Sequence, residues 1–327
     1  MATTQSTAAA SSLIPAPITS VQPGGGFCYG LELAWGRLRR ALLRRFRPGY
    51  VRRMLEHRQG HCPDCPHDVI DARDLKLFRN VCGYHFGPEN DPYSRRGWLP
   101  LAKAGRAELY VFSFVFEVLL IAASLLGAYI HPLFLWLPSP IIVLLWGFVI
   151  SFFRDPERMV SSDPAALISP ADGTVTHVEE VSDADFPGGR AFRVSIFLSV
   201  FNVHVNRNPR PARVTRLQYF PGAFLDARAS ECAVRNEQLW IDYEDGPTGV
   251  PIRVKQIAGA IARRIVCWLK QGEEVKAGAR LGMIKFGSRT DVLLPVSAVG
   301  EVRIKVGDKV CGGSTVLLRL TSGMERG

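Results

Sequence analysis

Hydrophobic and polar residues divide this chain into a first half with two long apolar stretches and a second half of short alternating runs. The apolar stretches cover residues 109–130 and 133–153, and each is long enough to cross a hydrocarbon layer of roughly 30 Å as a helix. Only a His-Pro pair separates them, which predicts a hydrophobic helical hairpin over 106–155. Pro138 and Pro140 predict a kink, because proline removes a backbone donor.

Basic residues flank the hairpin and the connecting turn has none. Lys103 and Arg106 precede it, and Arg154 and Arg158 follow it. By the positive-inside rule both ends face the cytoplasm, so we expect the chain at the cytoplasmic face of the cell (inner) membrane. A re-entrant hairpin, or a buried hairpin of a soluble domain, remains the alternative.

After Ser161 the sequence favours a mainly antiparallel β structure, because short runs rich in β-branched and aromatic residues alternate with turn residues. Helical periodicity is confined to 223–234. The predicted strands are 174–178, 191–198, 214–219, 238–243, 252–257, 265–268, 281–286, 292–295, 302–306 and 316–320.

An internal repeat of the form G-x-x-V-x-x-G-x-x-apolar occurs at 272–281 and again at 307–316. Such turns resemble those of biotinyl/lipoyl-type barrel-sandwich folds. The predicted fold class is therefore a barrel-sandwich-like antiparallel β domain with an N-terminal helical, membrane-associated region. Ordinary β-turns give the same short string, so a plain β domain is the alternative.

Composition divides the rest of the chain. Residues 1–30 are rich in small residues and read as a disordered tail, followed by a basic and Cys/His-rich segment at 31–105, the hairpin at 106–155 and a catalytic domain at 160–322. The net charge of +10 is concentrated at 37–53, which has eight arginines and no acid. This segment predicts a basic amphipathic helix on an anionic membrane, with a solvated helix or nucleic-acid arm as alternatives. No nucleic-acid-binding motif occurs.

Four residues of metal-binding types lie between the basic segment and the hairpin. Cys62 and Cys65 form one pair, and Cys82 and His85 follow sixteen residues later. Three cysteines and one histidine at this spacing are typical of a tetrahedral structural zinc site. Buried or unpaired reduced thiols are the alternative.

Polar motifs interrupt the strand pattern at 152–158, 169–175, 196–209 and 282–292, and the last, Gly-Gly-Ser-Thr, lies at 312–315. In this order and at these separations they resemble the phosphatidylserine decarboxylase family, in its short, pyruvoyl-dependent form. The resemblance covers about residues 150–320.

The chain departs from the usual family pattern at three positions. Gly312 stands where the family usually has leucine, Val200 where it has proline, and Ala212 follows a proline where glycine is usual.

The resemblance implies self-cleavage between Gly313 and Ser314, which leaves a covalent pyruvoyl group derived from Ser314. The serine hydroxyl needs a base, and a histidine oriented by a carboxylate supplies one. We therefore expect His204 and Asp172 to act with Ser314, and the cleaved α and β chains to stay together. A Schiff base between the pyruvoyl group and phosphatidylserine would then release phosphatidylethanolamine, with His204 as a possible proton donor.

Weaker candidates for contacts to the substrate are Arg207, Asn236, Glu237, Gly287 and Ser288. The competing functions are a membrane-anchored, non-catalytic adaptor of the biotinyl/lipoyl type, a decarboxylase of a related phosphoserine lipid, and a homologue that fails to mature. A homo-oligomer is compatible with the sequence.

Overall fold

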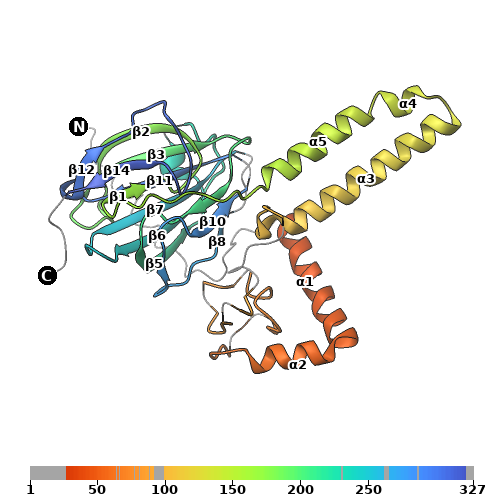
Figure 1. Cartoon of the computed structure of the whole chain (residues 1–327), viewed down its shortest axis with the longest axis horizontal. Coiled ribbons are helices and arrows are strands. Elements are labelled where there is room, and N and C mark those ends of the chain that lie inside the picture. The colour runs from red at the N-terminus through yellow and green to blue at the C-terminus, as the bar shows by residue number, and fades with distance from the viewer. Residues whose placement is uncertain are drawn as a thin grey trace, which may run out of the picture.

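The computed structural model describes residues 27–321, apart from 64, 66, 77, 81, 88, 92–98, 230, 261–264 and 286. Helices and irregular chain precede a domain of antiparallel strands (Figure 1), which confirms the predicted fold class. Most of the tail predicted over 1–30 lies outside the described residues, and its last four residues belong to the first helix. The helical elements are α1 (Phe27–Phe46), α2 (Pro48–Glu56), η1 (Lys103–Gly105), α3 (Arg106–Tyr129), α4 (Leu133–Trp136), α5 (Ser139–Phe152), α6 (Cys232–Arg235) and η2 (Val296–Ala298).

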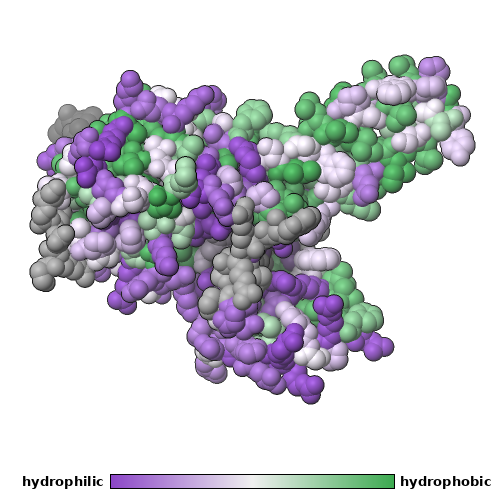
Figure 2. Space-filling model, viewed as in Figure 1, coloured by the Kyte–Doolittle hydropathy of each residue, from purple (hydrophilic) through white to green (hydrophobic). Residues whose placement is uncertain are grey.

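The hairpin extends away from the β domain (Figure 1) and presents apolar side chains on its surface (Figure 2). The two candidate membrane spans, Lys103–Tyr129 and Leu133–Phe152, have 11% and 6% of their apolar windows buried. A core helix of a soluble domain is mostly buried, so this exposure does not match the soluble-hairpin alternative. The prolines have the expected effect, because they divide the second stretch into α4 and α5.

Several arginines of the basic segment are paired with acids of the same chain. It forms α1 and α2, and α2 begins at Pro48, whose missing N–H costs nothing in the first turn of a helix. Arg39 and Arg40 are largely buried in ion pairs with acids at positions 71 and 74, and Arg44 pairs with the acid at 68. These arginines hold the helix on its own chain, and the predicted contact of the basic segment with a membrane stays a prediction for the other arginines.

The β domain is built around an eight-stranded antiparallel sheet of order β13-β2-β3-β11-β7-β6-β5-β9, with two three-stranded sheets, β1-β14-β12 and β4-β10-β8. Every residue of β11 is buried because it lies at the centre, between β3 and β7. The strands are β1 (Ala166–Ile168), β2 (Gly173–Ser182), β3 (Arg190–Leu198), β4 (Val205–Arg207), β5 (Ala212–Phe220), β6 (Gln238–Asp245), β7 (Pro251–Ala258), β8 (Ile265–Cys267), β9 (Glu274–Val275), β10 (Arg280–Ile284), β11 (Ser288–Leu294), β12 (Val299–Val302), β13 (Lys309–Val310) and β14 (Val316–Leu320).

The two turns of the predicted repeat have the same backbone shape. Gly272 and Gly307 have φ of 84° and 95°, and Gly278 and Gly313 have φ of 71° and 80°. Residues with a side chain are strained in this region, so glycine is required at all four positions. One two-residue strand, β9 or β13, lies between the glycines of each pair, which confirms the repeat.

The strands that receive these turns are related in the same way. β13 pairs with the start of β2, and β9 pairs with the start of β5. The Arg207 N–H donates to the Pro170 carbonyl at 2.8 Å, and the Ile168 N–H donates to the Pro209 carbonyl at 3.1 Å. These reciprocal bonds join the two halves as a pseudo-twofold pair. The Ser169 N–H donates to the Thr315 carbonyl at 2.8 Å, and this bond places the 169–172 turn beside the 311–315 turn.

A buried ionic cluster joins the N-terminal region to the β domain. Lys285 follows β10 and pairs with Glu108 at the start of α3, and its Nζ lies 3.7 Å from Glu32 of α1. Lys76 donates to the same Glu32 carboxylate at 2.7 Å. Removing one member of such a cluster leaves an uncompensated buried charge, so the cluster fixes how these segments meet.

Two expectations for the domain are wrong in detail. The strand expected at 302–306 is β12 (Val299–Val302), and the helix expected at 223–234 is only α6 (Cys232–Arg235). The Asn236 side chain bonds to both the N–H and the carbonyl of Leu225, which stabilises the preceding segment as a loop.

Candidate active site

The Gly-Ser bond lies in the tight turn between β13 and β14. The Gly313 N–H donates to the Ser169 carbonyl at 2.7 Å, and the Ser314 N–H donates to the Cys311 carbonyl at 3.1 Å. A Cβ at position 313 would lie 2.6 Å from Arg207 Cδ. Both the positive φ and this close approach therefore require glycine before Ser314.

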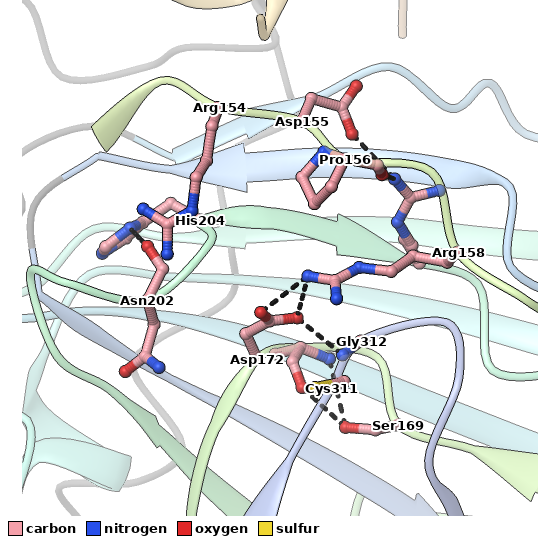
Figure 3. A network of polar contacts seen from close by, with 12 residues as sticks. Arg154, Asp155, Pro156, Arg158, Ser169, Asp172, Asn202, His204, Cys311 and Gly312 are labelled. Atoms are coloured by element: carbon pink, nitrogen blue, oxygen red, sulfur yellow. Dashed lines mark hydrogen bonds and ion pairs between the residues drawn. The ribbon is translucent and has the colours of Figure 1, made fainter. Parts of the chain in front are cut away.

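Asp172 contacts this turn directly (Figure 3). The Gly312 N–H donates to Asp172 Oδ1 at 2.7 Å, and Arg158 Nη2 donates to both carboxylate oxygens, at 2.8 and 2.7 Å. A Cβ at position 312 would lie 3.0 Å from the carbonyl carbon of Ala171. The glycine that replaces the usual leucine therefore packs closely beside Asp172.

Residues 154–158, which follow the hairpin, cover the turn, and we call this segment the strap. Arg207 donates to Asp155 Oδ1 at 2.7 Å, to the Pro156 carbonyl at 2.8 Å and to the Gly278 carbonyl at 3.0 Å. Arg158, from the same strap, places its Cβ 3.4 Å from a Cβ added at Gly313. Asp155 and Arg158 are not among the site residues predicted from the sequence, although the 152–158 motif contains both.

His204 has a separate set of partners (Figure 3). Its Nδ1 lies 2.9 Å from the Asn202 carbonyl, and its Nε2 accepts from the Gly287 N–H at 3.3 Å. A carbonyl only accepts, so the neutral ring carries its proton on Nδ1. Burial lowers the pKa of His204 to about 4, and the ring is therefore neutral at physiological pH.

The expected contact between His204 and Asp172 is not formed among the described residues. His204 lies just before β4, where its ring packs against Phe152 at the base of the hairpin, with centroids 4.3 Å apart. Asp172 immediately precedes β2, accepts from the Gly312 N–H of the β13–β14 turn and pairs with Arg158. The expectation that the carboxylate orients the histidine is therefore wrong, and the individual roles of both side chains remain to be proposed.

The weaker candidates divide into two groups. Arg207 is engaged by the strap, and the Asn236 amide bonds to Leu225 and to the Ala258 carbonyl. Gly287 contacts His204, and Ser288 follows it. The Ser288 hydroxyl is buried, and within the described part of the chain it has no hydrogen-bond partner.

Glu237 is a buried acid beside Tyr219, and burial raises its pKa to about 7. Between its ordinary value of about 4.3 and pH 7, the unfolded chain loses this proton while the folded chain keeps it, so the carboxyl increasingly destabilises the fold as pH rises. Glu237→Gln should therefore gain stability over wild type between pH 5 and pH 8, by at most about 3 kcal/mol. Chemical denaturation at both pH values measures this. An advantage that is equal at both would contradict the raised pKa.

The Arg158–Asp172 pair gives a second prediction. Arg158→Met keeps the aliphatic stem beside Gly313 but removes the charge that holds both oxygens of Asp172. A hydrogen bond to a charged group contributes about 1.5–3 kcal/mol. Cleavage of the Gly313–Ser314 bond should therefore slow roughly 10- to 100-fold. Arg190→Met, in the exposed pair with Glu180, is the matched control. Intact mass measured over time reports peptide-bond cleavage, and equal rates in both variants would exclude a role for Arg158.

The metal-ligand candidates are brought together only in part. The sulfurs of Cys62, Cys65 and Cys82 lie within 4.8 Å of one another, and His85 is not a member of this group. His85 is exposed, and its backbone pairs with Gln59.

The sequence of this chain is similar to those of known proteins. A sequence model of the phosphatidylserine decarboxylase family matches residues 145–318. A phosphatidylserine decarboxylase proenzyme of Rhodopirellula baltica is 40% identical over 251 residues, which is 76% of this chain and 100% of that protein. Proenzymes of the same name from Desulfotalea psychrophila and Cupriavidus pinatubonensis are 46% and 42% identical, over 54% and 62% of this chain and 81% and 91% of their own lengths.

Proposed function

Since this chain belongs to the phosphatidylserine decarboxylase family, we propose that it is a proenzyme that cleaves itself between Gly313 and Ser314 and then converts phosphatidylserine to phosphatidylethanolamine. The observation that carries the residue assignment is the contact between Asp172 and the turn that holds the Gly-Ser bond. The non-catalytic adaptor is not supported, because the family is enzymatic and the turn has an acid against it.

Self-cleavage needs only groups at this turn. The Ser314 hydroxyl attacks the Gly313 carbonyl carbon, and the peptide bond becomes an ester with a free amine on residue 314. Elimination then releases the Gly313 carboxylate and leaves a dehydroalanine, which water converts to a pyruvoyl group with loss of ammonia. Asp172 is the proposed acceptor of the serine proton, and Arg158 fixes its orientation.

The residues around position 314 fit a pyruvoyl group. A Cβ built on Gly278 would lie 3.7 Å from the Gly313 carbonyl oxygen, which is an ordinary contact distance, so this neighbouring turn leaves the scissile carbonyl uncrowded. The aliphatic stems of Arg158 and Arg207 lie 3.4 and 2.6 Å from a Cβ built on Gly313, and their guanidinium groups are paired with Asp172 and Asp155. When present, a pyruvoyl group at position 314 would supply an electrophilic carbonyl for the substrate amine and an electron sink for decarboxylation.

His204 is proposed to act on the substrate rather than on the cleavage turn. Its proton is fixed on Nδ1 by the Asn202 carbonyl, which leaves the Nε2 lone pair toward the Gly287 N–H. A neutral, buried imidazole of this kind can hold and return a proton at Nε2 without a charged ground state. The neighbouring Gly287 and Ser288 then become the proposed contacts for the lipid head group.

The hairpin is the proposed membrane anchor, with both ends on the cytoplasmic side because the basic residues lie at its base. The helix α1 adds an exposed apolar row, Trp35, Leu38, Leu42 and Phe46, which share one face at helical spacing. We propose that this row, with the arginines outside the ion pairs, lies on the surface of the same anionic membrane that presents the substrate.

Replacing two outward side chains of the hairpin by arginine should release the protein from vesicles. Ile121 and Leu144 are 55% and 73% exposed, and arginine at the centre of a membrane helix costs about 2.5–3.5 kcal/mol. Ile121→Arg with Leu144→Arg should therefore lose flotation with phosphatidylserine-containing vesicles, whereas Ile121→Leu with Leu144→Ile should float as wild type. Flotation of the arginine variant at high salt would contradict anchoring by the hairpin.

A further inference from the structure

The segment between α2 and the hairpin packs around a core that is small for its length. The buried residues of this core are Met54, Val69, Ala72, Leu75, Phe78, Cys82 and Phe86. Its described backbone consists largely of turns and bends, and an isolated bridge joins Gln59 to His85. Small, loop-rich units of this kind usually need a metal or a covalent cross-link for stability.

Two glycines bring the cysteines of this segment together. Gly60 has a φ of 84°, and a Cβ built on it would lie 2.2 Å from the Gly83 carbonyl oxygen. A Cβ on Gly83 would in turn lie 1.9 Å from the His61 carbonyl oxygen. The two chain segments therefore cross in direct backbone contact. Cys62 directly follows the crossing in the first segment, and Cys82 directly precedes it in the second.

The sulfur positions match a single tetrahedral ion. With Zn–S bonds of about 2.3 Å, neighbouring sulfurs of a tetrahedral shell lie about 3.8 Å apart. The three sulfurs lie within 4.8 Å of one another, and those of Cys65 and Cys82 are 3.2 Å apart. We propose that Cys62, Cys65 and Cys82 bind one zinc ion as thiolates, with release of their protons, and that water or an imidazole takes the fourth position.

This site is attached to the catalytic domain. Lys270 Nζ donates to the Cys82 carbonyl at 2.9 Å, and Asn80 Nδ2 donates to the Leu269 carbonyl at 2.7 Å. Leu269 and Lys270 lead into the Gly272–Gly278 turn, which is the pseudo-twofold partner of the cleavage turn. The metal therefore fixes the Cys82 carbonyl against the β domain, within the segment whose Asp71 and Asp74 pair with Arg39 of α1. Its role is structural, and it takes no part in the chemistry at Ser314.

Metal analysis of the full-length protein tests the site. Wild type purified under reducing conditions without chelator should contain about one zinc per chain. The Cys62→Ser, Cys65→Ser and Cys82→Ser variants should each contain less than about a tenth of this, because thiolates supply the binding. Cys232→Ser removes a buried thiol elsewhere and should keep the metal.

Cobalt replacement keeps the test decisive if the cysteine variants fail to fold. Cobalt-loaded wild type and Cys232→Ser should both show the intense thiolate-to-cobalt absorption of a tetrahedral site, and zinc should displace it. Absence of zinc from reduced wild type, a mass that shows a Cys65–Cys82 disulfide under those conditions, or cobalt without thiolate absorption would each overturn the proposal.

Discussion

Ser314→Ala is expected to remain one chain and to have no decarboxylase activity. Without the hydroxyl, nothing attacks the Gly313 carbonyl and no pyruvoyl group forms, so activity should fall roughly a thousandfold or more. The fold should be unaffected, because the hydrogen bonds of the turn use the Ser314 N–H and not its side chain. Intact mass spectrometry measures the first outcome, and release of carbon dioxide from phosphatidylserine measures the second.

Three further variants make that result specific. Ser314→Thr and Ser314→Cys keep a nucleophile and should cleave slowly. Thr315→Ser keeps the oxygen that accepts from the Cys311 N–H and should cleave at the normal rate. Full activity of an uncleaved Ser314→Ala chain would mean that the chemistry does not depend on this turn.

Asp172→Asn and His204→Gln are expected to separate maturation from catalysis. Asp172 contacts the turn through Gly312 and is the proposed acceptor of the serine proton, so loss of this base should slow cleavage by about 10²- to 10⁴-fold. His204 has no hydrogen bond to the turn among the described residues, so its variant should cleave normally. Loss of the group that transfers a proton on the substrate should then lower kcat by about 10²- to 10⁴-fold.

The two side chains are compared by counting cleaved chains and by activity per cleaved chain. Folding is checked by thermal unfolding, because the neutral His204 ring packs against Phe152 and glutamine fills less of that site. An uncleaved His204→Gln protein would restore the histidine as the base for Ser314, as the sequence first suggested. Normal cleavage of Asp172→Asn would remove Asp172 from maturation.

The local pattern was enough to predict much of the fold. The G-x-x-V-x-x-G repeat predicted both turns, since the need for glycine at Gly278 and Gly313 is a local backbone property. Long alternating runs predicted the long strands of the sheet. β9 and β13, with two residues each, were missed because they are defined by their partners rather than by their own sequence.

The site was predictable by residue type but not by arrangement. Asp172 and His204 stand in motifs of the kind that carry chemistry, yet which of them contacts the turn depends on strand pairing across the domain. The pairing of Arg158 with Asp172 and the pairing of Arg39 with Asp71 are likewise tertiary contacts. A run of arginines in the sequence gives no sign of which charges are neutralised by distant acids.

The most direct test of self-processing is intact mass spectrometry of the active, purified protein. The account predicts two pieces, one ending at Gly313 and one beginning at position 314 with a pyruvoyl group in place of an N-terminal amine. The smaller piece should resist Edman degradation and should gain mass on reduction with borohydride. A single uncleaved chain of 36.2 kDa in fully active protein would contradict the account.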